Sequence, residues 1–411
     1  MLAGLAFQPY TILRAVVPVK KFFLTSFLFI VLIGGVTATW VLYGFAFEIV
    51  AAPNKTFLID IPPGSSLSQI RKGLEKNEIH IHPLAWKLWA KFRADPKKLH
   101  VGEFEVSAQK SQLEILEEIL NAPSKTYALV IKEGHNIFNI RDEGLAALPL
   151  PQEVKAEFFS KITNAELAKN QGAPERANPP LTMEGFLFPS TYFFQKYDSA
   201  QSIFQKITNE YKKRIEPLLS EHSWGNTPEG RYRLLTLASV VEKESGVFDE
   251  QPLIASVFWN RIHKGMRLQS DPTTIYPYFL EAQKNIEQFN LKISHLREPS
   301  PYNTYTLKEL PVGPIANPGE SAVRAVIRPA QSNYFYFVAK GDGTHVFAAT
   351  LKEHNANVDF YQKKIRPKST VVRQKSRTSA RLKPQFLGLK QQMKPLKKRV
   401  LGSSRGPRPQ G

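Results

Sequence analysis

Two glutamates, Glu242 and Glu244, end an apolar helical stretch and carry a side chain that can act as a general acid. Apolar residues recur at helical spacing over residues 234–241, so the sequence predicts a helix with one buried face. The helix macrodipole places partial negative charge at the last turn, where it disfavours an ionised carboxylate. A half-buried glutamate there is expected to have a raised pKa, as a general acid at neutral pH requires. The alternative is that both are solvated charges, one of them paired with Lys243 or Arg267.

Two helices and a turn would position these carboxylates. The first helix is expected to end at Gly246 in a left-handed cap, and a second helix, over residues 252–264, to end at Gly265. The next stretch, MRLQSDPTTIY, indicates a tight turn and a short extended piece that presents four polar side chains: Gln269, Ser270, Asp271 and Thr273. Asp-Pro is a turn-forming pair, so Asp271 is equally consistent with an ordinary turn residue.

The run from Val240 to Tyr276, VVEKESGVFDEQPLIASVFWNRIHKGMRLQSDPTTIY, resembles the signature of the MltG (YceG-like) endolytic murein transglycosylases. The segments SPYNTY (300–305) and LPVGPIANPG (310–319) agree with it, and the similarity extends over about residues 57–361. Lytic transglycosylases carry a catalytic glutamate that is followed by Ser or Thr near a helix end. Glu244 is followed by Ser245, whereas Glu242 is followed by a lysine, so the resemblance implies Glu244 as the catalytic residue and Glu242 as second choice.

The resemblance implies a membrane-anchored peptidoglycan lytic transglycosylase that cleaves the β-1,4 bond between MurNAc and GlcNAc in nascent glycan strands. The product would be a 1,6-anhydroMurNAc end, and the cut would terminate or size strands during cell-wall synthesis. Glu244 would protonate the glycosidic oxygen and then take the proton of the MurNAc C6 hydroxyl, so no second carboxylate has to activate a water. Substrate-binding roles are implied for Glu184, Gln269, Ser270, Asp271, Thr273, Tyr302, Asn303 and Tyr305.

Two other functions remain open from the residues. One is a hydrolytic muramidase that pairs Glu244 with Asp271 or Glu242, and its products would have reducing ends in place of anhydro ends. The other is a non-enzymatic glycan-binding scaffold of the cell-wall growth machinery, for which Glu244→Gln would be as active in cells as the parent. The expected partners are peptidoglycan glycan strands, the inner membrane and cell-wall synthesis proteins.

Composition excludes several classes of site. The 411 residues include no cysteine and nine scattered histidines without HExxH, so neither a metal nor another cofactor is expected. The net charge of +19 lies at the ends: residues 363–411 hold sixteen Lys or Arg and no acid, and residues 1–47 hold three and no acid. A nucleic-acid-binding fold would carry its basic patch on the folded domain itself, so nucleic acid is not an expected partner.

Residues 22–47 contain no charged side chain and are long enough to cross a bilayer as a helix. Basic residues precede this stretch and Glu48 follows it, so the positive-inside rule places residues 1–21 in the cytoplasm. The expected location is the inner (cytoplasmic) membrane, with a single pass and the catalytic domain outside. A cleaved signal peptide is the alternative, although the apolar run is longer than usual and lacks a clear cleavage site.

The rest of the chain predicts an α+β protein with three parts. Residues 56–124 are expected to form a strand (57–63), two helices (65–79 and 82–94), a strand (102–108) and a helix (111–122). This order resembles the LysM-like subdomain of the family, which would contact glycan strands, and it is equally consistent with a small α+β packing module that binds nothing. Residues 125–362 would form the catalytic domain. The sequence predicts in it a strand at 127–131, helices at 153–169 and 200–220, and a hairpin with its turn around 341–343. Residues 363–411 form a basic tail with too little apolar surface to become ordered.

Overall fold

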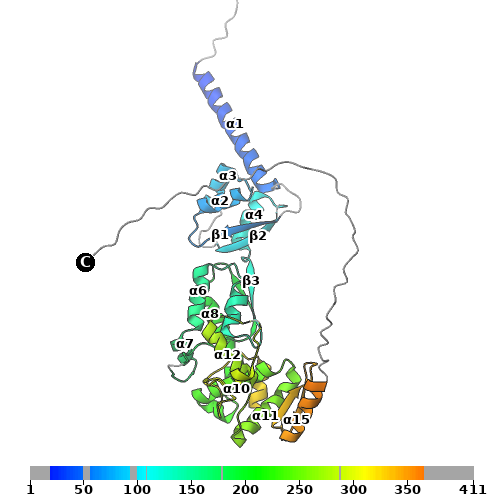
Figure 1. The fold of residues 1–411 in the computed structure, drawn as a ribbon. Helices are drawn as coiled ribbons and strands as arrows, with labels where there is room; N and C mark the ends of the chain where they lie inside the picture. The colour runs from blue at the N-terminus through cyan, green and yellow to red at the C-terminus, as the bar shows by residue number, and fades with distance from the viewer. Residues whose placement is uncertain are drawn as a thin grey trace, which may run out of the picture. The chain divides into compact units, whose positions relative to one another are not determined.

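The computed structural model describes residues 19–49, 56–92, 100–107, 109–176, 179–286 and 288–364 (Figure 1). Within these ranges, helices are interspersed with three two-stranded antiparallel sheets, which confirms the mixed helix-and-sheet class. The predicted basic tail, from residue 365 on, and the first eighteen residues of the predicted cytoplasmic segment lie outside the described residues.

Helix α1 (Val19–Phe47) contains the apolar stretch that the sequence marks as a membrane span. Its residues Lys20–Phe47 are apolar enough and long enough to cross a bilayer, and nothing in the described chain buries the most apolar part of it. The helix therefore fits a single-pass membrane anchor or a signal sequence near the N-terminus.

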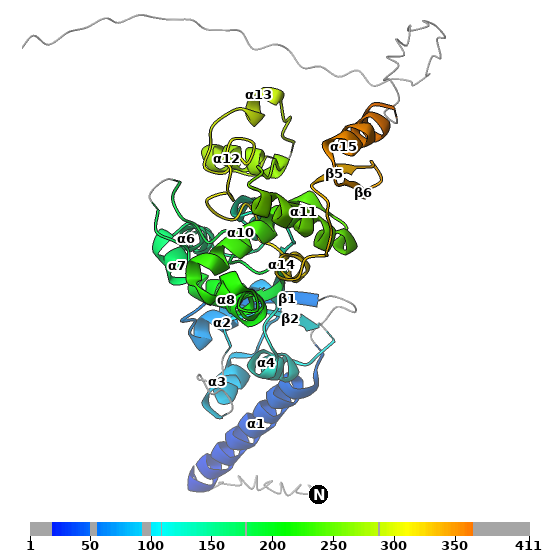
Figure 2. The same ribbon diagram turned by 90° about the horizontal axis from the view of Figure 1, so that it is seen from below.

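The next elements occur in the predicted order: β1 (Thr56–Ile61), α2 (Leu67–Lys76), α3 (Pro83–Phe92), β2 (Gly102–Ser107) and α4 (Gln112–Asn121) (Figures 1 and 2). Serine capping boxes start two of these helices, at Ser66 with Gln69 and at Ser111 with Glu114. β1 pairs antiparallel with β2, and alternate residues of β1 are buried against the three helices.

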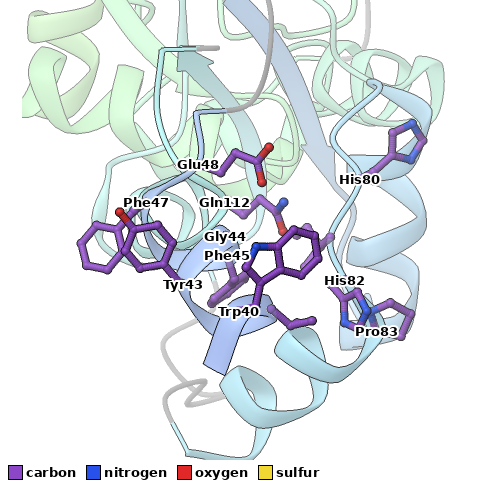
Figure 3. Close-up of a pocket in the computed structure, with 12 residues that line it drawn as sticks. Trp40, Tyr43, Gly44, Phe45, Phe47, Glu48, His80, His82, Pro83 and Gln112 are labelled. Atoms are coloured by element: carbon purple, nitrogen blue, oxygen red, sulfur yellow. The ribbon is translucent and has the colours of Figure 1, made fainter. Parts of the chain in front are cut away.

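The end of α1 packs onto this small unit. Phe45 is buried in its core, and Ile49 forms an isolated bridge with Ser111. A cavity of about 680 Å³ lies between the end of α1 and the loop before α3. Figure 3 shows Trp40 and Tyr43 on one side of this cavity and His82 on the other. The C-terminal end of α1 is therefore packed against the unit that β1, β2 and α2 to α4 form.

A second sheet begins the larger unit, where β3 (Thr126–Ile131) pairs with β4 (Ser190–Gln195). The helices between and after them are α5 (Ile137–Asn139), the π-helix η2 (Ile140–Leu145), α6 (Gln152–Ile162), α7 (Ala165–Asn170), α8 (Ala200–Arg214) and α9 (Glu216–Leu219). The predicted helices 153–169 and 200–220 are each two helices. In the first, Asn164 leaves the helical conformation to cap α7. In the second, a new short helix begins at Glu216, with Pro217 in its first turn.

Helix α10 (Pro228–Glu244) is the central helix of this unit and packs against α11 (Gln251–Lys264) and α14 (Glu320–Ile327) (Figure 2). All of residues 234–241 are buried, so the helix is covered on every side and the predicted single buried face is wrong. Its two interior hydroxyls are satisfied by the helix's own carbonyls: Thr236 donates to Tyr232 O and Ser239 to Thr236 O.

The remaining elements complete the described chain. They are the 3-10 helices η3 (Ser223–Asn226) and η4 (Phe248–Glu250), α12 (Asp271–Ala282), α13 (Ile293–Leu296), the strands β5 (Tyr336–Ala339) and β6 (His345–Ala348), α15 (Leu351–Val358) and the π-helix η5 (Asp359–Lys364). β5 and β6 form the predicted hairpin, with Gly341 and Gly343 at positive φ in its turn.

Candidate active site

Helix α10 ends at Glu244, earlier than the sequence predicts. Ser245 adopts an extended conformation, with φ −132° and ψ 125°, and its hydroxyl accepts a hydrogen bond from Val247 N at 3.0 Å. This side-chain turn ends the helix without a left-handed residue, so the predicted cap at Gly246 is wrong. The second predicted cap is confirmed, because Gly265 ends α11 at φ +67°.

Glu244 is half-buried, and the hydroxyl of Ser270 donates a hydrogen bond to its Oε1 at 2.5 Å. Burial raises the pKa of Glu244 to about 7, and the nearby charge of Asp271 adds to that rise. The hydrogen bond from Ser270 and the buried Arg261 guanidinium act in the opposite direction. The raised pKa expected from the sequence is confirmed, and its main cause is burial.

Glu242 has a raised pKa as well, also about 7. Burial is the main cause, the charge of Glu133 adds to it, and the hydrogen bond that Gly319 N donates to Oε2 at 2.9 Å opposes it. The pKa therefore does not distinguish Glu242 from Glu244. Their partners do, because Glu242 is bound by a backbone amide of the 317–319 segment and Glu244 by a polar side chain.

The stretch after α11 folds differently from the prediction. Asp271 is the first residue of helix α12, and Pro272 follows at a position where a helix tolerates proline, so the predicted extended piece is wrong. Gln269, just before it, has a left-handed backbone with φ +49° and an exposed side chain. The exposed Asp271 carboxylate accepts a hydrogen bond from the Tyr305 hydroxyl at 2.6 Å.

The structure therefore brings four predicted residues together as what we call the Glu244 cluster: Glu244, Ser270, Asp271 and Tyr305. Three more, Thr273, Tyr302 and Asn303, are buried beneath it. Thr273 donates to Ser270 O at 2.6 Å, and the Asn303 amide oxygen accepts from Thr274 at 3.1 Å. These buried side chains hold the 300–305 loop against α12.

Thr304 is a member of this scaffold that the sequence did not single out. Its hydroxyl accepts from Ser270 N at 2.9 Å and lies 2.7 Å from the hydroxyl of Thr273. It thereby fixes the backbone of the residue that binds Glu244. The signal in the sequence was its place inside SPYNTY, next to two residues that were singled out.

Glu184 lies away from the Glu244 cluster and is only 2% exposed. Its Oε2 accepts from Tyr276 OH at 2.9 Å and from Ile137 N at 3.1 Å, and its Oε1 accepts from Asn317 Nδ2 at 2.8 Å. Burial raises the pKa of Glu184 to about 8, although the hydrogen bonds that it accepts lower it. Both oxygens are engaged by protein, so this side chain joins three segments of the chain.

A cavity of about 630 Å³ lies beside α12. None of the predicted site residues lines it, but close neighbours of the two glutamates and of Asp271 do. Its lining consists of Asn136, Asn139, Glu143, Lys243, Pro272, Ile275, Tyr276, Phe279, Asn285, Ile286, Phe289 and Ile315. Among the residues with described positions, no group of three His, Asp or Glu is arranged to hold a metal ion.

Two similar proteins of known sequence carry the same name. The chain is 31% identical over 331 residues to the endolytic murein transglycosylase of Bacillus subtilis (strain 168), covering 76% of this chain and 87% of the relative. It is 27% identical over 372 residues to the endolytic murein transglycosylase of Streptococcus pneumoniae serotype 2 (strain D39 / NCTC 7466), covering 83% of this chain and 65% of the relative.

A solved structure agrees with these sequence matches. The crystal structure of the yceG-like protein lmo1499 from Listeria monocytogenes matches with a TM-score of 0.50 at 29% identity, covering 73% of this chain and 98% of that chain. The sequence profile of the YceG-like family matches residues 59–360, which is well over half of the 411 residues. By this match and by its likeness to the Bacillus protein, the chain belongs to the YceG-like family.

Proposed function

We propose that this protein is an endolytic murein transglycosylase that cleaves the bond between MurNAc and GlcNAc and leaves 1,6-anhydroMurNAc ends. The observation that supports this most is the half-buried carboxyl group of Glu244 at the end of α10, which the Ser270 hydroxyl orients and which exposed polar side chains adjoin. Burial raises its pKa to about 7, as a general acid requires. The relatives from Bacillus and Streptococcus carry the name of the same activity.

The proposed reaction uses one carboxyl group in both directions. Glu244 first donates its proton to the glycosidic oxygen as the bond to MurNAc C1 breaks. It then accepts the proton of the MurNAc C6 hydroxyl while that oxygen bonds to C1. The enzyme regains its starting protonation state and no water is consumed, so the reaction has no need of the second carboxylate that hydrolysis requires.

The neighbours of Glu244 would support both steps. Ser270 holds one oxygen of the carboxyl and so fixes its orientation. The exposed Asp271 carboxylate, which the Tyr305 hydroxyl binds, would stabilise positive charge that develops at C1. Gln269 is the other exposed polar group for sugar contacts, whereas Thr273, Tyr302, Asn303 and Glu184 would act by positioning. Glu242 remains the second candidate for the acid.

The other parts of the chain suit the same activity. We propose that α1 anchors the protein in the inner membrane with its N-terminus in the cytoplasm, near the place where glycan strands are made. The strand-helix-helix-strand unit from β1 to β2 would be a LysM-like glycan-binding subdomain, and cell-wall synthesis proteins would be neighbours. The anchor's length and the order of these elements support this assignment.

Product chemistry tests the proposal. The full chain in detergent is incubated with purified murein, and the released fragments are identified by mass spectrometry. Anhydro ends, lighter than reducing ends by the mass of one water, are expected. Reducing ends would instead establish the muramidase, in which Asp271 or Glu242 activates a water, and no release of fragments would favour the scaffold.

The pH profile should show the titration of Glu244. Because the acid must start protonated, kcat/KM is expected to fall as the pH rises through about 7. Ser270→Ala removes a hydrogen bond that lowers the pKa of Glu244, so the falling limb should move to higher pH. Ser220→Ala, at an exposed serine, is the matched control. A profile of Ser270→Ala that is unchanged or moves to lower pH would refute this role for Ser270.

A further inference from the structure

Lys243 lies between the two glutamates and is the one Lys or Arg among the described residues that line the cavity beside α12. The other charged side chain there, Glu143, is already engaged. Its Oε1 accepts hydrogen bonds from Asn139 Nδ2 at 2.8 Å and from Asn285 Nδ2 at 3.0 Å. Glu143 keeps its charge and its side chain is 45% exposed, so Lys243 is the cation, and not the only charge, that a ligand meets in this cavity.

The ammonium group of Lys243 has few protein partners. It carries three hydrogen-bond donors, and the bond that it makes, to Gly134 O, is long at 3.3 Å. In the described part of the chain no carboxylate oxygen lies within 4.0 Å of its Nζ. Surrounding protein lowers the pKa of Lys243 by desolvation, while the charges of Glu242 and Glu184 oppose that shift. The exposed ammonium therefore has donors that its bond to Gly134 O leaves available to a ligand.

The walls of the cavity show what else the ligand must carry. Apolar and aromatic side chains line one part of the cavity, and polar side chains line the rest. The apolar part comes from α12 and the segments around it, with Ile275, Tyr276, Phe279, Ile286, Phe289 and Ile315. A volume of about 630 Å³ is far more than a lone carboxylate fills and is typical of sites for ligands of several residues. The volume, the cation and the apolar part of the lining are the features that a short peptide with a free carboxylate would use.

We propose that Lys243 binds a carboxylate of the murein stem peptide and that the apolar walls of this cavity hold the peptide's methyl and methylene groups. The inference rests on the proposed function, because the stem peptide hangs from the lactyl group of MurNAc, the sugar that Glu244 would act on. Once the peptide amidates that lactyl group, the glycan itself carries no charge. Lys243, the residue before Glu244 in α10, would therefore distinguish strands that bear peptides from bare glycan.

Binding of small ligands tests this inference without any cleavage. Calorimetry with the full chain in detergent compares GlcNAc-MurNAc that carries the stem peptide, the same compound with its peptide carboxylates amidated, and GlcNAc-MurNAc with a free lactyl carboxylate. None of them contains the bond that would be cut. The first should bind about tenfold more tightly than the other two, the scale of one hydrogen bond to a charged group.

Variants assign the difference to Lys243. Lys243→Met should abolish the preference, whereas Lys243→Arg should keep it. Lys264→Met, at an exposed lysine that does not line the cavity, should keep it as well. Equal binding of the amidated compound by the parent, or an intact preference in Lys243→Met, would overturn the proposal. Equal binding of the lactyl compound would overturn the choice of the peptide in favour of the lactyl carboxylate.

The two proposals fail in different ways. A chain that prefers the free peptide carboxylate through Lys243 but releases no anhydro ends would refute the proposed activity and keep the subsite. A chain that releases anhydro ends but binds the three compounds equally would refute the subsite and keep the activity.

Discussion

Glu244→Gln is expected to lower the release of anhydro-muropeptides from murein by about 10²–10⁴-fold, the usual contribution of a general acid and base. Glutamine has nearly the same shape and can still accept the hydrogen bond from Ser270, but it has no acidic proton to give to the glycosidic oxygen. The measurement is the initial rate of fragment release, followed by mass spectrometry. Thermal melting of parent and variant should agree, because the substitution removes no packing.

Glu242→Gln is the matched control, since both glutamates have a pKa of about 7 and lie in the same helical turn. Its amide can still accept the hydrogen bond from Gly319 N, so the fold should be retained. We expect this variant to cut at a rate within a few-fold of the parent. If Glu244→Gln cuts normally and Glu242→Gln does not, the acid is Glu242.

Asn317→Ala is expected to cause the largest loss of stability. Asn317 is fully buried, and its amide makes four hydrogen bonds. Its oxygen accepts from Gly185 N and Leu187 N, and its nitrogen donates to Glu184 and to His135 O. Alanine removes the partner of Gly185 N, Leu187 N and Glu184 Oε1, whereas His135 O keeps its bond from the backbone N–H of residue 317. The cost should be about 3 kcal/mol or more. Such a loss corresponds to a fall in Tm of about 6–12 °C for a domain of this size.

Asn121→Ala provides the comparison for Asn317→Ala. Asn121 is exposed, and its side chain bonds only Glu117 O within its own helix. Its replacement should change the Tm by no more than about 2 °C, as is typical of surface substitutions. Melting curves of the two variants, recorded in the same detergent, check the contrast. Equal melting temperatures would show that the Asn317 network adds nothing to the fold.

Much of the fold could be predicted because its signals are local. The serine caps at Ser66 and Ser111, the alternation in β1 and the glycines of the hairpin each act over a few residues. Predictions failed where the local sequence allows two conformations and contacts with other parts of the chain accompany the one that was not predicted. Asp271-Pro272 suits a turn and also the start of a helix, and the contacts of Thr273 with Thr304 accompany the helix.

The site was predictable in part for the same reason. Glu244, Ser270 and Asp271 lie within one recognisable stretch, so their proximity followed from it. Asn317 and Glu133 were missed because their contacts are distant in sequence. Asn317 donates a hydrogen bond to Glu184, and the Glu133 side chain lies beside Gly319. Glu184 was predicted to bind substrate, yet its surroundings occupy both of its oxygens. Burial of a polar side chain depends on the whole fold, which a sequence motif does not report.

Digestion of murein in water enriched in ¹⁸O tests the central claim most directly. If Glu244 protonates the glycosidic oxygen and then accepts the proton of the C6 hydroxyl as that oxygen bonds to C1, no oxygen from water enters the product. The full chain is therefore expected to give ends without ¹⁸O and with the mass of an anhydro sugar. New ends that carry one ¹⁸O atom would show that water attacks C1, and would contradict the account.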